Sequence, residues 1–150
     1  MRRRDRQISE EEALAILAHG EYGVLSTVSP DGVSYGLPLN YCLLEGKIYF
    51  HVALAGKKLD HIMVNPRISF CVVGPTQILP EQFSTRYESC IAEGVAEEVF
   101  GAEKLAALAA IVAKYSPGFI AEGAEYIAEK HERARVLAVT ITCLTGKARR

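Results

Sequence analysis

The sequence predicts a mainly β protein of the α+β class, an antiparallel barrel of about six strands with short helices at its rim. β-prone stretches follow one another across short turns, helical patterns are few, and no strand–helix–strand repeat occurs. The 150 residues, of which 49% are hydrophobic, suit one domain over residues 1–150 with a substantial core.

The N-terminal part predicts a short amphipathic helix over residues 9–19. Ser9 and Glu12 form a capping-box pattern, in which each side chain can bond the backbone N–H of the other residue. Apolar residues follow at helical spacing, and Gly20 supplies the stop signal.

A hairpin is expected next, because the β-prone residues 22–28 and 33–43 flank the turn sequence Ser29-Pro30-Asp31-Gly32. The second strand alternates cleanly between a bulky face that suits a core and a face of small or polar residues. A flat ligand could approach the backbone on the small-residue face, or that face could be the exposed outside of a barrel. The bulky face holds Val33, Tyr35, Leu37, Leu39 and Tyr41, and the other face holds Ser34, Gly36, Pro38, Asn40 and Cys42.

The stretch from Ile48 to Pro66 is the most informative part of the chain. It predicts a strand over residues 47–52, a small-residue turn over residues 53–56, and a helix over residues 57–64 that ends at Asn65-Pro66. Lys57 and Lys58 open this helix, where cations oppose the helix dipole. Two ammonium groups beside free backbone N–H groups would suit a phosphate, although both lysines could equally point into water.

The sequence pattern after residue 66 predicts three β segments or strands, two helices and one loop. They are a buried strand over residues 67–73, a loop over residues 74–82, a β segment over residues 83–100 with a bend at Gly94, helices over residues 103–114 and 122–131, and a last strand over residues 136–144.

Composition and motifs exclude several classes of protein. The net charge of −1 argues against a nucleic-acid partner, and the basic chain ends are expected to be solvated. No apolar stretch approaches the roughly 18 residues that a membrane span needs, and no signal-peptide core follows the charged N-terminus, so we expect a cytoplasmic protein. The four cysteines form no C-x-x-C pair, and we expect them to be reduced and mostly buried, without a metal.

His51 is the candidate for chemistry that local sequence offers. G-x-S-x-G, H-E-x-x-H, G-x-G-x-x-G and P-loop motifs are all absent. His51 stands at the end of a strand, just before the turn that leads to Lys57 and Lys58. There an imidazole could donate a hydrogen bond to a ligand or transfer a proton, or it could serve the structure alone.

The chain resembles the 5-nitroimidazole resistance (Nim) family, within the pyridoxamine 5′-phosphate oxidase-like split-barrel flavoproteins. The likeness runs through nearly the whole chain, and its most specific block is H-x-A-x-x-G-K-K-L-D. It is carried by R-R-x-D-R, Y-G-V-L-S-T, Y-G-L-P-L-N-Y, Y-F-H-V-A-L-A-G-K-K-L-D-H-I, N-P-R-I-S-F, F-S-T-R-Y-E-S-C-I-A-E-G-V-A-E-E-V and the ending L-T-G-K-A-R.

The resemblance implies a split β-barrel homodimer with FMN at the interface between the subunits. By position, the flavin phosphate would be held by Lys57 and Lys58, and His51 would lie near the flavin ring as the catalytic residue. The full set of cofactor-binding positions that it implies is Leu37, Pro38, Leu39, Asn40, Tyr41, His51, Val52, Ala53, Lys57, Lys58 and Ser89.

Two departures from the family pattern narrow the function. The C-terminal Arg-x-His type motif of true pyridoxamine phosphate oxidases is missing, which argues against oxidation of vitamin B6. Val52 stands where a small polar residue is common, which removes one hydrogen bond to the cofactor. The resemblance therefore implies an FMN-dependent oxidoreductase that reduces nitro-aromatic or other small molecules; the alternative is a non-catalytic module that binds or sequesters flavin or haem.

Overall fold

The computed structural model describes residues 3–150, and the strands of this part form one antiparallel seven-stranded sheet in the order β2-β1-β5-β6-β7-β4-β3. The strands are β1 (Gly23–Val28), β2 (Ser34–Leu39), β3 (Cys42–Leu44), β4 (Lys47–Val52), β5 (Arg67–Leu79), β6 (Ser84–Val99) and β7 (Arg135–Arg149). The α-helices are α1 (Glu10–His19), α2 (Lys57–Val64), α3 (Gly101–Tyr115) and α4 (Ile120–Lys130), and single 3₁₀ turns cover Arg4–Arg6, Pro80–Gln82 and His131–Arg133. The predicted mainly β, α+β class is confirmed.

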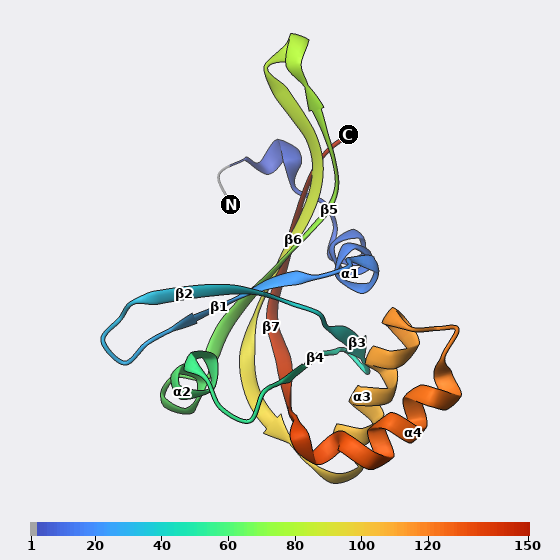
Figure 1. Ribbon diagram of the computed structural model, residues 1–150. Coiled ribbons are helices and arrows are strands. Elements are labelled where there is room, and N and C mark those ends of the chain that lie inside the picture. Colours follow the sequence, from blue (N-terminus) through green and yellow to red (C-terminus); the bar gives the residue numbers. More distant parts are fainter. Residues whose placement is uncertain (1–2) are drawn as a thin grey trace.

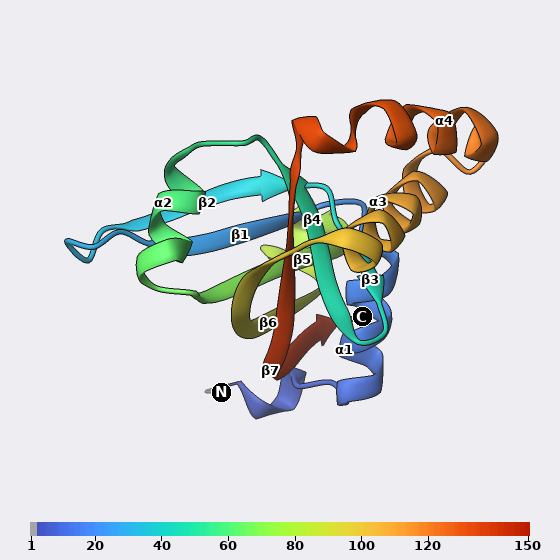
Figure 2. The same cartoon turned by 90° about the horizontal axis from the view of Figure 1, so that it is seen from below.

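Two residues connect the opposite edges of this sheet. β2 lies at one end of the strand order and pairs with β1, whereas β3 lies at the other end and pairs with β4. Only Asn40 and Tyr41 stand between β2 and β3, so the two edges must approach each other. The sheet consequently curls into the predicted barrel (Figure 2), which within residues 3–150 is split along the line between β2 and β3.

The expectation of one continuous strand over residues 33–43 is therefore wrong, because the chain changes partner strand at Tyr41. The hydroxyl of Tyr115, at the end of α3, accepts a hydrogen bond from the backbone N–H of Tyr41 at 3.0 Å and donates one to the carbonyl of Glu21 at 2.6 Å. A side chain thus replaces the neighbouring strand as the partner of this backbone N–H.

A long hairpin of β5 and β6 projects from the barrel (Figure 1). The predicted loop over residues 74–82 is mostly strand, since β5 continues to Leu79 and only Pro80–Gln82 and Phe83 turn the chain. A register shift between Val73 and Thr76 accommodates Gly74 and Pro75, which is where a proline can be tolerated in a strand. Near the tip, the side chains of Ile78 and Phe83 are exposed.

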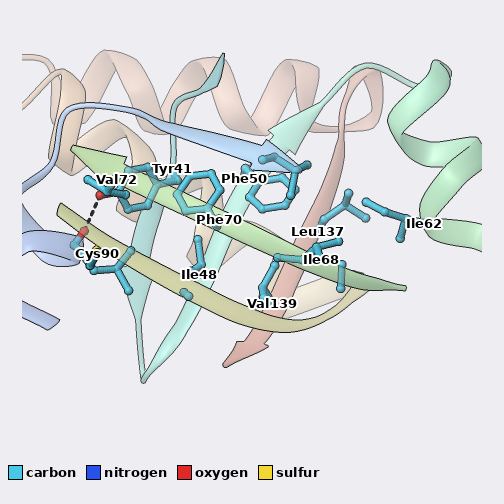
Figure 3. Close-up of a cluster of buried hydrophobic side chains, with 14 of the residues drawn as sticks. Tyr41, Ile48, Phe50, Ile62, Ile68, Phe70, Val72, Cys90, Leu137 and Val139 are labelled. Atoms are coloured by element: carbon cyan, nitrogen blue, oxygen red, sulfur yellow. Dashed lines mark hydrogen bonds between the residues drawn. The ribbon is translucent and has the colours of Figure 1, made fainter. Parts of the chain in front are cut away.

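The barrel interior is filled by aromatic and branched aliphatic side chains (Figure 3). Tyr41 and Phe70 meet edge to face with ring centroids 4.9 Å apart, and Phe50 stacks on Phe70 at 6.1 Å. Such aromatic pairs add to the stabilisation from burial itself. Other members of this core are Leu17, Leu25, Ile48, Val52, Ile62, Ile68, Val72, Cys90, Leu137 and Val139.

β4 separates this core from a second, outer one. Ile48, Phe50 and Val52 point into the barrel, whereas Tyr49 joins a cluster under α3 that includes Ala107 and Ile111. Alternation along the strand places His51 on the same outer face as Tyr49. α3 and α4 lie on this side of the barrel (Figures 1 and 2).

The predicted bend at Gly94 is confirmed. The register of β6 against β7 shifts between Glu93 and Gly94, and a Cβ atom at Gly94 would lie 2.5 Å from the carbonyl oxygen of Thr140. Only glycine allows the two strands to approach this closely. β7 is longer than the expected residues 136–144, because it pairs with β6 along almost its whole length.

The capping box of α1 is also confirmed. The N–H of Glu12 donates to the hydroxyl oxygen of Ser9 at 3.1 Å, and the N–H of Ser9 donates to the Glu12 carboxylate at 3.0 Å.

The four cysteines are unpaired. Cys42 and Cys90 are buried, as expected, whereas the thiol of Cys143 is exposed, which differs from the expectation that the cysteines are mostly buried. None of the helices in the described part of the chain has the length and hydropathy needed to cross a membrane.

Candidate functional site

The N-terminus of α2 is an open end with two cations. Gly56 precedes the helix with φ of 145°, a conformation that favours glycine, and no side chain caps the helix. The carbonyl of Gly56 accepts from the N–H groups of Leu59 and Asp60 at 2.9 and 3.2 Å. The N–H groups of Lys57 and Lys58 precede the first helical hydrogen bonds, so they are available to an anion.

The side chains of Lys57 and Lys58 are also available to an anion. Lys57 is exposed and Lys58 is partly buried. Neither belongs to an ion pair among residues 3–150. The ammonium of Lys57 lies 5.7 Å from the centroid of the Tyr35 ring on β2, within range of a cation–π contact. The phosphate-binding end predicted from the sequence therefore adjoins the predicted ring-binding strand.

A buried polar pair holds α2 in this position. Nδ1 of His61 lies 3.0 Å from the hydroxyl oxygen of Thr27 on β1, and both side chains are buried. The ring of Tyr35 meets the His61 imidazole edge to face, with centroids 5.8 Å apart. Because these contacts join α2 to β1 and β2, they fix where the lysines stand relative to the sheet.

The small-residue face of β2 is exposed. It forms part of the outside of the barrel, and it is also open to a flat ligand. Ser34, Gly36, Pro38 and Asn40 are open to solvent, and the nearest atom to a Cβ built on Gly36 is Val24 Cγ1 at 3.6 Å. Since β2 is an edge of the sheet, a ligand can approach its backbone from the face and from the open edge.

Other predicted contacts on this segment have inward-pointing side chains. Leu37 and Leu39 pack against the barrel core, and Tyr41 is completely buried. The hydroxyl of Tyr41 donates to the carbonyl of Leu17, and burial raises its pKa well above the usual range. These residues can meet a cofactor only through backbone atoms or by shaping the strand.

The end of β4 presents one exposed candidate side chain, that of His51. His51 is exposed, Ala53 follows it on the surface, and Val52 is buried in the barrel core. The guanidinium of Arg135 donates to the Leu54 carbonyl at 3.4 Å and to the Glu98 carboxylate at 2.9 Å. Arg135 thus ties the turn before the lysines to the start of β7.

Ser89 lies far from these residues within one chain. Ser89 pairs with Lys147 near the C-terminus, whereas Val99 pairs with Val136, which is opposite His51. The ten positions of β6 between Ser89 and Val99 correspond to about 33 Å of strand. The structure therefore places Lys57 beside Tyr35 on β2, on the side of the strand opposite to Gly36, Pro38 and Asn40, and it places Ser89 far from the α2 lysines.

Sequence reasoning missed the side chains that support the site. Tyr115, Arg135 and the Thr27–His61 pair act on residues distant in sequence, so local spacing gives no signal for them. His131, at the end of the helix expected over residues 122–131, lies in the 3₁₀ turn after α4, where it is partly buried and lines a cavity. Within the described residues, no group of three or more potential metal ligands is found.

A family model described as pyridoxamine 5′-phosphate oxidase matches residues 9–148, which is nearly all of the chain. The chain belongs to the pyridoxamine 5′-phosphate oxidase family. The match includes β2, β4 and α2, so the site described above lies within the family domain. A comparison with curated proteins finds no similar one.

Solved structures show that the fold of this pyridoxamine 5′-phosphate oxidase-family chain is a known one. A candidate 5-nitroimidazole antibiotic resistance protein from Bacteroides thetaiotaomicron superposes with a TM-score of 0.75 at 19% identity, covering 94% of this chain and 85% of that one. A conserved hypothetical protein from Mycobacterium tuberculosis gives 0.83 at 19% identity, covering 99% and 89%. An FAD and heme binding protein from Mycobacterium smegmatis gives 0.82 at 19% identity, covering 95% and 73%. The split-barrel prediction is confirmed.

Proposed function

We propose that this protein binds FMN and uses it as an oxidoreductase for nitro-aromatic or other small molecules. The observation that carries the proposal is the open N-terminus of α2, where Lys57 and Lys58 lie beside free N–H groups and Lys57 adjoins Tyr35 on β2. Phosphate is the anion that such a cradle suits best.

The small-residue face of β2, on the other side of this edge strand from Tyr35, suits a flat ring system. Gly36, Pro38 and Asn40 leave the face of β2 low and exposed, so an isoalloxazine could contact its backbone closely. Asn40 adds an amide that can donate and accept hydrogen bonds. The backbone of Leu37, Leu39 and Tyr41 completes this wall, although their side chains face inward.

Bound FMN would supply the electron transfer, while the protein supplies binding, orientation and electrostatics. In this proposal Lys57 and Lys58 neutralise the phosphate, and Ala53 and the backbone of Val52 border the ring. The exposed imidazole of His51 donates a hydrogen bond to the ring or the substrate, and can hand over a proton.

The proposal includes a homodimer with one flavin site at each end of its interface. Ser89 is too far along β6 to reach the α2 lysines of its own chain, so the Ser89 that completes a site would come from a second subunit. The exposed Ile78 and Phe83 of the β5–β6 hairpin are apolar surface that a second subunit could cover. We place the protein in the cytoplasm, where its four unpaired cysteines would stay reduced.

A second candidate is a non-catalytic module that sequesters flavin or haem. Support comes from the structural relatives, since the set includes an FAD-binding protein and a heme-binding protein, both from Mycobacterium smegmatis. His51, exposed beside a cavity, offers an imidazole that could serve as an iron ligand in that case.

The test is the absorption spectrum of the purified protein, followed by identification of any cofactor released on denaturation. FMN, FAD and haemin are then titrated separately, and reduction of a 5-nitroimidazole is measured with NADH or NADPH. Yellow protein that releases FMN and turns over supports the main proposal. Tight flavin or haemin binding without turnover supports the second candidate, and a colourless protein that binds none of the three contradicts both.

A further inference from the structure

A cavity of about 310 Å³ lies between the outer face of β4 and the α3–α4 helix pair. His51 lines it from the end of β4, and the rest of the lining comes from α3, α4 and the residues that follow α4. The volume is at the lower end of the range for pockets that enclose small ligands. The cavity is on the opposite face of β4 from the barrel core.

One side of this cavity is apolar. Leu108, Ile111 and Val112 project from successive turns of α3, and Tyr126 and Ile127 face them from α4. Ile111 is buried, whereas Tyr126 is largely exposed, so the apolar wall runs from the core to the surface. Such a wall would desolvate the body of a small apolar molecule.

The other side of the cavity is cationic. Lys130, His131 and Arg133 line it within four positions of sequence, and no aspartate or glutamate lines it. Of the ion pairs formed by residues 3–150, none includes Lys130 or Arg133. The Lys130 ammonium lies 4.5 Å from the centroid of the Tyr126 ring, so the charge is held at the edge of the apolar wall.

We propose that this cavity binds a small amphipathic anion, with an apolar body the size of one aromatic ring and a carboxylate or phosphate group. The body contacts Leu108, Val112 and Tyr126, and the anionic group meets Lys130 and Arg133. Arg133 is suited to a bidentate contact with either group. The bound anion then lies beside His51; its role as substrate rests on the proposed flavin function, but its binding does not.

The test uses benzoate, phenyl phosphate and neutral benzyl alcohol as probes, titrated by calorimetry into the full chain with and without FMN. Both anions should bind more tightly than benzyl alcohol, and the tighter of the two identifies the preferred group. Arg133→Glu should weaken anion binding by at least roughly tenfold, since it removes a charge-assisted contact. Ala134→Leu should also weaken it by filling the cavity, and its extended backbone accepts the larger side chain.

Arg4→Glu is the matched control, because Arg4 is exposed in the N-terminal 3₁₀ turn and distant from the cavity lining. Unchanged anion affinity in both cavity variants, or equal binding of benzyl alcohol and benzoate, overturns the inference. So does the absence of any binding by the unmodified chain. FMN binding without anion binding refutes only this inference, whereas anion binding without flavin binding refutes only the proposed function.

Discussion

The hydroxyl of Thr27 lies 3.0 Å from Nδ1 of His61, and this buried contact joins the first strand of the barrel to the helix that carries Lys57 and Lys58. Two segments that are far apart in the chain thereby set the position of a candidate phosphate site. The contact also makes the site sensitive to substitutions that never touch a ligand.

Thr27→Val should lower the free energy of unfolding by about 1–3 kcal/mol, because it leaves Nδ1 of the buried imidazole without its partner. The double variant with His61→Leu should recover part of this loss, since neither polar group then remains. Urea denaturation of the two single variants and the double variant measures the coupling. Strictly additive losses would show that the two side chains do not interact.

Lys57→Ala with Lys58→Ala should weaken FMN binding well over tenfold while the fold survives, since each charge-assisted contact contributes roughly 1.5–3 kcal/mol. Fluorescence titration of FMN measures the change. Lys47→Ala is the control, because Lys47 forms ion pairs with Glu97 and Glu103 on the outer face of the barrel. Lys47 has no part in the proposed phosphate site. Equal affinities in the double variant and the unmodified protein would remove the phosphate cradle from the proposal.

His51→Ala should retain bound FMN but lower the turnover of a 5-nitroimidazole by roughly 10²–10⁴-fold if the imidazole transfers a proton. The absorption spectrum reports flavin content, and steady-state kinetics report turnover. His19→Gln is the control, since His19 is exposed at the end of α1 and its Nδ1 lies 2.8 Å from the carbonyl of Ala15. Full activity of the His51 variant would assign the residue to structure alone.

Glu98 makes part of the stability depend on pH. The Arg135 guanidinium beside it lowers the pKa of this carboxyl in the folded state. The pair therefore stabilises the protein above the unfolded pKa of about 4.3, and this contribution is lost as the pH falls through the folded pKa. Glu98→Gln should cost about 0.5–1 kcal/mol at pH 7 and progressively less below about pH 4.

Urea denaturation at stepwise lower pH measures that difference, with Glu81→Gln at the exposed hairpin tip as control. A deficit in the Glu98 variant that stays constant down to pH 3 would contradict the assignment.

Gly94→Ala should destabilise the barrel by about 1–3 kcal/mol, because the added methyl group would lie 2.5 Å from the Thr140 carbonyl oxygen and 2.6 Å from a Val139 methyl group. Gly36→Ala is the matched control, since its nearest neighbours are at ordinary contact distances of 3.6 and 3.9 Å. Thermal unfolding compares the two. The Gly36 variant should fold normally yet bind FMN less well. Equal melting temperatures of the Gly94 and Gly36 variants would exclude close packing at Gly94 as the cause of the bend.

Local signals in the sequence predict the parts of the fold that local interactions determine. The Ser9–Glu12 capping box, the alternation on β2 and the glycine–lysine start of α2 are all properties of a few neighbouring residues. The break of the second strand is different, since it depends on the hydroxyl of Tyr115, 74 positions after Tyr41. Gly74 and Pro75 were misleading for a similar reason, because the long pairing with β6 keeps them within a strand.

The candidate site likewise has features that local sequence predicts and features that depend on strand pairing. The sequence predicts His51, Lys57 and Lys58 as candidates, because a strand end and a helix start are local features. It does not reveal that Val52 and Tyr41 turn their side chains into the barrel, or that Ser89 lies a long way along β6 from the lysines. Those facts depend on which strands pair, and pairing is a property of the whole chain.

The two-residue connection between β2 and β3 constrains the order in which the molecule can assemble. The hairpins β1–β2 and β3–β4 are local and can form early, but they are directed to opposite edges of the sheet. β4 finds its second neighbour only in β7, which is synthesised after the other six strands of the sheet. Until then, β4 and β6 expose unpaired backbone that can associate with other chains. A nascent chain that stalls before residue 135 should therefore depend on chaperones far more than the finished barrel.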